Sequence, residues 1–135
     1  MRVIGDRAFM DCNDLTSVAI PSSVKVIGEK AFWFCHALAN VNLAEGIEVL
    51  GKEAFLGCLD LGNVSIPSTI EEIGAGCLAY AYKMNSVSVD EGNQYFKSID
   101  GVVYSKDGTR LVWFPAGRTG EWTVPEHVTE IGGFS

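Results

Sequence analysis

Apolar residues recur along this chain with a period of 23 residues. An aliphatic residue followed by glycine stands at positions 4–5, 27–28, 50–51 and 73–74. Ala-Phe stands at 8–9, 31–32 and 54–55, cysteine at 12, 35 and 58, and valine at 18, 41, 64 and 87. A fixed period of this length is the sequence signature of a solenoid, in which each coil packs on the previous one. The pattern therefore predicts a stack of coils with apolar columns inside.

Within one repeat the pattern changes from alternation to a helical spacing. Residues 40–43 alternate polar and apolar side chains, which is typical of a half-buried strand, and residues 47–50 form a second short apolar run. Gly51 follows, and its conformational freedom would allow a sharp backbone turn. Ala54 and Cys58 then stand four residues apart, as on one face of a helix. Each coil is expected to contain a strand, a turn, a second strand and a short helical turn.

The period is interrupted after residue 90. Residues 107–108 are Asp-Gly between two apolar runs, which predicts a β-hairpin insertion near residues 99–115. Val124-Pro125 then restarts the repeat. We expect a single domain over residues 1–135, with repeats at about 4–26, 27–49 and 50–72, a degenerate repeat at 73–92, the insertion at 93–121 and a partial repeat at 122–135.

Both ends of the chain fall within a repeat, since residue 1 is in phase with Val24 and the chain stops shortly after Ile131-Gly132. Solenoids need polar caps over their terminal coils, and neither end of the sequence supplies one. We therefore expect a segment of a longer repeat protein, or a short protein that hides its ends by end-to-end self-association.

The acidic balance of the chain limits its partners. The net charge is −7, from 17 acidic and 10 basic residues. Nucleic acids and anionic membranes require a basic face, so neither is an expected partner. The sequence also lacks an apolar run long enough to span a membrane, and it shows no signal peptide.

The cysteines and histidines do not form a recognisable catalytic or metal-binding set. Cys12, Cys35 and Cys58 share one column, which favours a ladder of buried thiols, with a disulfide or a metal site as the alternative. His36 would point away from Cys35, because adjacent residues on a helical turn diverge by about 100°. His127 lies far along the sequence. We therefore expect no enzyme, no cofactor and no metal.

Two surfaces are candidate partner-binding sites. The outward positions of the first strand carry small polar side chains, which suit a broad macromolecular surface or simply keep a sheet soluble. These positions are Ser17, Asn40, Asn42, Asn63, Ser65, Ser86 and Ser88. Trp33 and Phe34 form a second candidate surface, although packing between coils would also explain them. Among the hairpin aromatics, Trp113 and Trp122 would either stack on a sugar or cover the end of the stack.

The pattern Ile-Gly-x-x-Ala-Phe-x-x-Cys-x-x-Leu-x-x-Val-x-Ile-Pro-x-x-Val, as it stands from Ile4 to Val24, resembles the BspA-like leucine-rich repeats of bacteria and protists. The resemblance extends to about Val89 and resumes at Thr123. It implies an α+β solenoid, a right-handed coil of short strands and short helical turns, whose small polar positions line a concave face.

The same resemblance implies a function. Such repeats occur on secreted or cell-surface proteins that act in adhesion and protein binding, so the expected partner is a protein of a host or of a cell surface. Two alternatives stay open: a glycan-binding module that uses the hairpin aromatics, or spacer repeats attached to an enzyme outside this chain.

Overall fold

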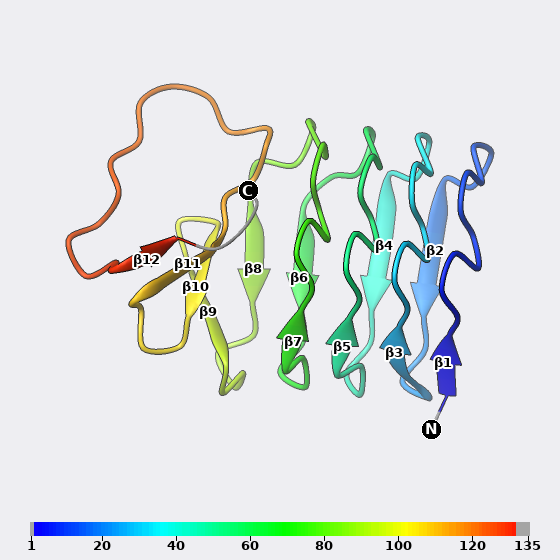
Figure 1. Ribbon diagram of the computed structural model, residues 1–135, viewed down its shortest axis with the longest axis horizontal. Coiled ribbons are helices and arrows are strands. Elements are labelled where there is room, and N and C mark those ends of the chain that lie inside the picture. The colour runs from blue at the N-terminus through cyan, green and yellow to red at the C-terminus, as the bar shows by residue number, and fades with distance from the viewer. Residues whose placement is uncertain (1, 132–135) are drawn as a thin grey trace.

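The computed structural model describes residues 2–131 as a stack of coils followed by a hairpin (Figure 1). One layer of the stack is a four-stranded parallel sheet of β1 (Arg2–Ile4), β3 (Val24–Ile27), β5 (Val49–Leu50) and β7 (Glu72–Ile73). The other layer contains β2 (Ser17–Ile20), β4 (Asn40–Leu43), β6 (Val64–Ile66) and β8 (Val87–Val89), paired in parallel as β2–β4 and β6–β8. Val18 pairs with Val41 and Val64 with Val87, so successive coils are in register.

The predicted apolar columns fill the interior of the coils. Phe32 is fully buried, and its ring stacks on those of Phe9 and Phe55 with centroid distances of 5.0 Å on each side. Leu38 and Leu61, two members of another column, are also buried. The solenoid prediction is therefore confirmed, and the repeated residues are its core.

The prediction of helical turns, and with it the α+β class, is wrong. Residues 2–131 contain no helix, and residues 28–35 and their equivalents in other coils form consecutive tight turns. Lys30 and Phe34 have φ angles of 57° and 54°. A continuous right-handed helix does not contain such left-handed residues. Every described element of the fold is thus a β-strand or a turn.

Hydrogen bonding between coils explains why tight turns replace the helix. The amides of Ala31 and Trp33 donate within their own coil, to carbonyl oxygens three residues back. The amides of Lys30, Phe32 and Phe34 instead donate to the next coil, at 3.0, 2.7 and 2.8 Å. An α-helix would direct all of these amides along its own axis. The alternation therefore satisfies the backbone and joins adjacent coils at the same time.

In the second to fourth coils, the glycine that follows the aliphatic residue at positions 27, 50 and 73 is required for close packing rather than for a sharp turn. Gly51 is not among the glycines with positive φ. A Cβ atom at Gly51 would lie 2.6 Å from the carbonyl carbon of Gly28, and one at Gly74 would lie 2.6 Å from the carbonyl carbon of Gly51. At Gly5, in the first coil, a Cβ atom would meet nothing within 4 Å. Glycine is thus needed where one coil lies against another.

Replacing Gly51 with alanine should therefore lower the free energy of unfolding by about 2 kcal/mol, since the clash involves backbone atoms that cannot move aside. The matched control is Gly5→Ala, which adds the same methyl group into open space. Urea unfolding followed by circular dichroism measures both variants. Equal unfolding midpoints for the two variants would show that close packing does not select the glycine.

The hairpin forms the far end of the stack (Figure 1). Its sheet contains β9 (Phe96–Ile99), β10 (Val102–Ser105), β11 (Arg110–Trp113) and β12 (Glu130–Ile131). β10 and β11 are antiparallel around the predicted Asp107-Gly108 turn. Hydrogen bonds from Thr109 and Ser105 hold this turn and lower the pKa of Asp107 to about 2. The expected partial repeat includes residues 132–135, which lie outside the described residues.

Asn93 joins the last coil to the hairpin, and the sequence pattern gave no indication of this role. Its side chain is 1% exposed. The Nδ2 group donates to the carbonyl oxygens of Pro67 and Ile70, at 3.0 and 2.9 Å. The Oδ1 atom accepts from the amides of Tyr95 and Phe96, at 2.8 and 2.9 Å. One side chain thus completes the turn of the preceding coil and begins β9.

Candidate functional site

The outward side chains of β2, β4, β6 and β8, with the residues that precede β6 and β8, form a polar surface that we call the ladder face. It consists of Ser17, Ala19, Asn40, Asn42, Asn63, Ser65, Ser86 and Ser88. The strand register places Ser17 beside Asn40, Ala19 beside Asn42 and Ser65 beside Ser88. A shallow groove of about 360 Å³ runs along this face from Ser17 to Ser65. The structure thus brings the predicted strand positions together on one surface.

Part of the ladder face is held by its own hydrogen bonds. The Oδ1 atom of Asn63 accepts from the amides of Asn85 and Ser86, at 3.2 Å each. The Ser88 hydroxyl donates to that of Ser65 at 2.9 Å. Such bonds lower the cost of ordering these side chains on binding a partner.

Asn40 and Asn42 differ from the rest of the ladder face. Both are exposed, and neither side chain has a hydrogen-bond partner among residues 2–131. Each amide group offers two donor hydrogens and an acceptor oxygen. These two side chains are therefore the ones most available to a partner.

Ser86 is less available than the sequence predicts. It is half-buried, and Gly101 packs against it so closely that a Cβ atom on the glycine would lie 2.6 Å from the Ser86 hydroxyl oxygen. The amide of Val87 donates to the Gly101 carbonyl at 2.9 Å. The hairpin thus limits the ladder face at its last coil.

The ladder face suits binding rather than chemistry. Its side chains are hydroxyls, amides and one methyl group, and none of them titrates near neutral pH. The charges nearby are Glu45 and Asp90, which line a second shallow hollow of about 330 Å³ together with Ser65 and Ser88. A partner would therefore meet neutral hydrogen-bonding groups with acidic groups at one side.

Trp33 and Phe34 pack largely within the stack. Both side chains are half-buried, and their rings meet edge to face at 4.3 Å. Phe34 lies over Gly57 of the next coil, where a Cβ atom would be 2.7 Å from the Phe34 ring. Tyr80 and Tyr82 are the more exposed aromatic residues of this region, with exposed fractions of 50% and 59%. The Trp33–Phe34 surface is therefore smaller than the sequence suggests.

The aromatic residues of the hairpin mainly pack against its interior. Trp113 and Tyr104 are each 2% exposed. Trp122 is half-buried and tilts against Phe114 at a centroid distance of 4.8 Å. A buried ring cannot stack on a sugar, so Trp113 does not provide the glycan platform considered from the sequence.

All four cysteines are free thiols, and in the predicted column Cys35 and Cys58 are buried whereas Cys12 is half-buried. Cys35 donates to the Phe9 carbonyl oxygen at 3.0 Å, and Cys58 to the equivalent oxygen of Phe32 at 3.2 Å. Burial raises the pKa of Cys35, and it raises those of Cys58 and Cys77 to about 12. Thiols of this kind remain protonated and are poor nucleophiles.

We expect Cys58 and Cys77 to resist alkylation by iodoacetamide at about pH 8 in the folded chain, whereas denaturant should expose all the thiols. Mass spectrometry of tryptic peptides measures the labelling of each site. Unfolded thiols ionise near pH 9.0. The stability gained by keeping these thiols protonated is therefore complete below pH 9 and declines as the pH rises toward 12. Labelling of Cys58 at the unfolded rate would contradict this account.

The two histidines make contacts with residues other than the cysteines. His36 is exposed, and its ring meets that of Phe34 at 5.4 Å. The Nδ1 atom of His127 is 2.6 Å from the carbonyl oxygen of Gly108 in the hairpin. Across residues 2–131, no three His, Cys, Asp or Glu side chains come together as a metal site. The same residues include no helix that could span a membrane.

The repeat unit identifies the family. The model of the BspA type leucine-rich repeat region matches residues 2–103 in six copies. The chain belongs to this family. The description of the BspA-type repeats names no catalytic activity, and no curated protein matches the chain.

Solved structures of bacterial proteins, two of them described as leucine-rich repeat proteins, are similar to this fold. The pneumococcal vaccine antigen PcpA is 29% identical with a TM-score of 0.88, over 97% of this chain and 33% of PcpA. A leucine-rich repeat protein from Eubacterium ventriosum is 24% identical with a TM-score of 0.78, over 96% of this chain and 41% of that protein. A leucine-rich repeat protein from Bacteroides ovatus is 22% identical with a TM-score of 0.62, over 98% of this chain and 37% of that protein. The chain thus spans only a third to two fifths of these proteins.

Proposed function

We propose that this chain is a non-catalytic, protein-binding part of a secreted or cell-surface protein, and that the ladder face is its contact surface. The observation that carries the proposal is the pair of exposed side-chain amides at Asn40 and Asn42, which have no hydrogen-bond partner among residues 2–131 and lie in a shallow groove on the sheet. Concave and regular faces of solenoids are common binding surfaces.

The energetics favour a broad contact rather than a pocket. The parallel ladders already fix the backbone of the face, so a partner does not have to order it. Each new hydrogen bond contributes only about 0.5–1.5 kcal/mol net, so useful affinity needs several of them together. The four strands of the ladder face supply such a series, and its neutral groups are cheaper to desolvate than charges.

A location outside the cell is supported by the comparison with PcpA, which is described as a vaccine antigen. We extend that location to this chain as part of the proposal. A protein partner is favoured over a glycan, because Trp113 is buried and Trp122 is half-buried against Phe114.

The proposal predicts that lysines at positions 40 and 42 weaken partner binding at least tenfold, or by about 1.4 kcal/mol. Long charged side chains would fill the groove and remove two amides. The experiment immobilises the chain, captures biotin-labelled cell-surface proteins and then measures the affinity of each purified candidate by surface plasmon resonance. A glycan array run in parallel tests the alternative class.

The matched control is Asn13→Lys with Gln94→Lys, which replaces two side-chain amides with lysine at exposed positions outside the ladder face. The control should bind as the native chain does, and all variants should share one melting temperature. Equal loss of binding in both double variants would indicate a charge effect. Unchanged binding of Asn40→Lys with Asn42→Lys would remove the ladder face as the contact surface.

A further inference from the structure

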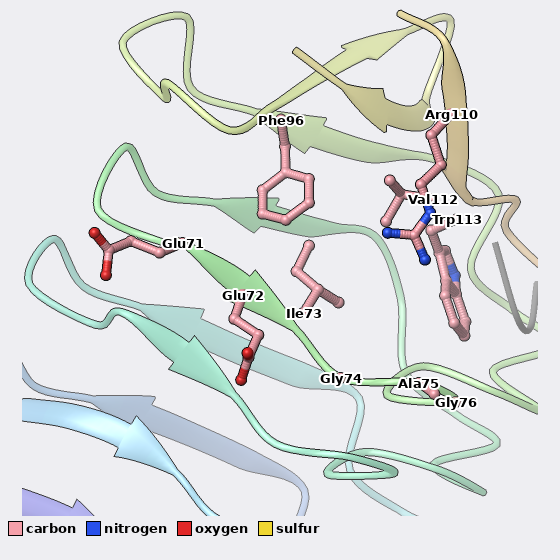
Figure 2. A pocket seen from close by; sticks show the side chains of 10 residues that line it. All are labelled: Glu71, Glu72, Ile73, Gly74, Ala75, Gly76, Phe96, Arg110, Val112 and Trp113. Atoms are coloured by element: carbon pink, nitrogen blue, oxygen red, sulfur yellow. The ribbon is translucent and has the colours of Figure 1, made fainter. Parts of the chain in front are cut away.

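The sheet β1-β3-β5-β7 ends at β7 beside a groove that the ladder face does not include. Figure 2 shows this groove between β7 and the hairpin, with Ile73 on the β7 side and Phe96, Val112 and Trp113 on the hairpin side. Arg110 of the hairpin also lines it. Its volume is about 210 Å³. This is room for a short stretch of extended chain with one aliphatic side chain.

Backbone acceptors line the β7 side of the groove. One coil earlier, the carbonyl oxygens of Glu48 and Leu50 accept hydrogen bonds from the amides of Glu72 and Gly74, at 3.2 and 2.8 Å. The equivalent acceptors are the carbonyl oxygens of Glu71, which directly precedes β7, and of Ile73 within it. Within residues 2–131 these two oxygens receive no hydrogen bond, because β7 pairs only with β5. The next coil would have supplied the donors, but the chain turns into the hairpin instead.

A polar group without a partner stands on the opposite side. Trp113 is only 2% exposed. In the described part of the chain, its Nε1 atom is the one buried side-chain nitrogen or oxygen that has no hydrogen-bond partner. Buried polar groups are normally satisfied, and leaving one unpaired costs about 1–3 kcal/mol. The Trp113 side chain lines the groove. Its Nε1 atom is itself buried, so an acceptor has to enter beside the indole ring to reach it.

We propose that this groove is a strand-addition site for an extended peptide segment of a protein partner. The amides of the peptide donate to the carbonyl oxygens of Glu71 and Ile73, as the next coil would have done. A peptide carbonyl oxygen accepts from Trp113 Nε1, and an aliphatic side chain packs on Ile73, Phe96 and Val112. Main-chain hydrogen bonds of this kind provide affinity, while the side-chain hollow provides selectivity.

Charge and backbone chemistry narrow the class of peptide. Glu71 and Glu72 lie at the β7 side of the groove and Arg110 at the hairpin side, so a basic residue of the peptide is favoured only where it faces β7. Proline is excluded where the peptide must donate, because it has no amide hydrogen. The preferred segment is therefore extended, aliphatic and basic, like the β3 strand of this chain. This site does not depend on the ladder face.

The probe is a blocked synthetic peptide with the sequence of residues 23–29, Ser-Val-Lys-Val-Ile-Gly-Glu. It is titrated into the full ¹⁵N-labelled chain while the indole N–H resonances are followed by NMR. Trp113→Phe assigns the resonance of Trp113. We expect a saturable downfield shift of that resonance, with the other two indoles unchanged. A Trp113 resonance that does not move at saturating peptide would overturn the proposal.

Two N-methylated peptides test the strand geometry. One is methylated at the positions of Val24 and Val26, the other at those of Lys25 and Ile27. Because alternate amides of a strand face the same neighbour, one peptide should lose affinity at least tenfold and the other should bind nearly as the parent does. Equal affinity of the two peptides would overturn strand addition.

A variant that fills the groove completes the test. Ala75 is exposed and lines the groove, so Ala75→Trp should weaken the peptide at least tenfold without unfolding the chain. Ala116→Trp, at an exposed position that does not line the groove, should leave binding unchanged. Asn40→Lys with Asn42→Lys should also bind the peptide normally, which separates this proposal from the one on the ladder face. Full binding by the Ala75→Trp chain would contradict the assigned groove.

Discussion

Replacing Phe32 with alanine is expected to destabilise the chain by about 4 kcal/mol, the largest effect of a single apolar substitution considered for this fold. Phe32 is fully buried, and its ring stacks on Phe9 and on Phe55. The cavity would open in the middle of a column whose backbone is fixed by hydrogen bonds to both neighbouring coils, so the site cannot collapse easily.

Urea unfolding of Phe32→Ala measures this loss, with Phe9→Ala as the matched control. Phe9 occupies the same phase of the repeat but is 40% exposed in the first coil, so its loss should cost about 1 kcal/mol. The difference between the two losses in unfolding free energy gives the contribution of burying a ring between two neighbouring coils rather than against one. Similar midpoints for the two variants would mean that the stacked column does not contribute to stability in the way that its geometry indicates.

Replacing Asn93 with alanine is expected to cost about 3 kcal/mol, because the substitution leaves buried polar groups unpaired. Two carbonyl oxygens and two amides depend on this one side chain. The loss should be concentrated at the junction with the hairpin, since the hydrogen-bond partners of Asn93 lie in the preceding turn and in the segment that leads into β9.

Hydrogen–deuterium exchange of Asn93→Ala measures the loss of stability and shows which residues it affects. Protection should fall most in residues 95–105, whereas β3 and β5 should exchange as in the native chain. The control is Asn63→Ala, which also removes hydrogen bonds to two amides but at an exposed position where water replaces them. A native exchange pattern in Asn93→Ala would show that Asn93 does not anchor the hairpin.

The sequence predicts the stack and its core because both depend on side chains that recur. The columns of Phe32, Leu38 and Cys58 keep one period, and each column becomes one line of contacts in the structure. The Asp107-Gly108 turn is likewise a local signal, since its backbone conformation depends on these residues and their neighbours.

The turns in each coil could not be predicted in the same way, because they depend on the neighbouring coil. The spacing of Ala54 and Cys58 is compatible with a helix, but the amides of Phe32 and Phe34 find acceptors in the next coil. The same limit applies to Gly51, whose requirement for glycine comes from the backbone of Gly28. A local pattern does not contain this information.

The candidate site was predictable only in part. The outward positions Asn40 and Asn42 follow from the alternation within a strand, and the structure places them two residues apart on the exposed side of β4. The half-burial of Ser86 depends on Gly101, which arrives from the inserted hairpin. The Trp113 indole and the β7 edge, both unpaired within residues 2–131, likewise arise where the hairpin meets the stack. Sequence periodicity cannot describe a junction that occurs once.

The most direct test of the central claim, that the ladder face is the contact surface, is site-specific photo-crosslinking. A p-benzoylphenylalanine side chain is placed at position 42 on the ladder face, or at the exposed position 52 on the turns, and each chain is irradiated with the captured partner. We predict a covalent adduct from position 42 and none from position 52. An adduct from position 52 without one from position 42 would contradict the account.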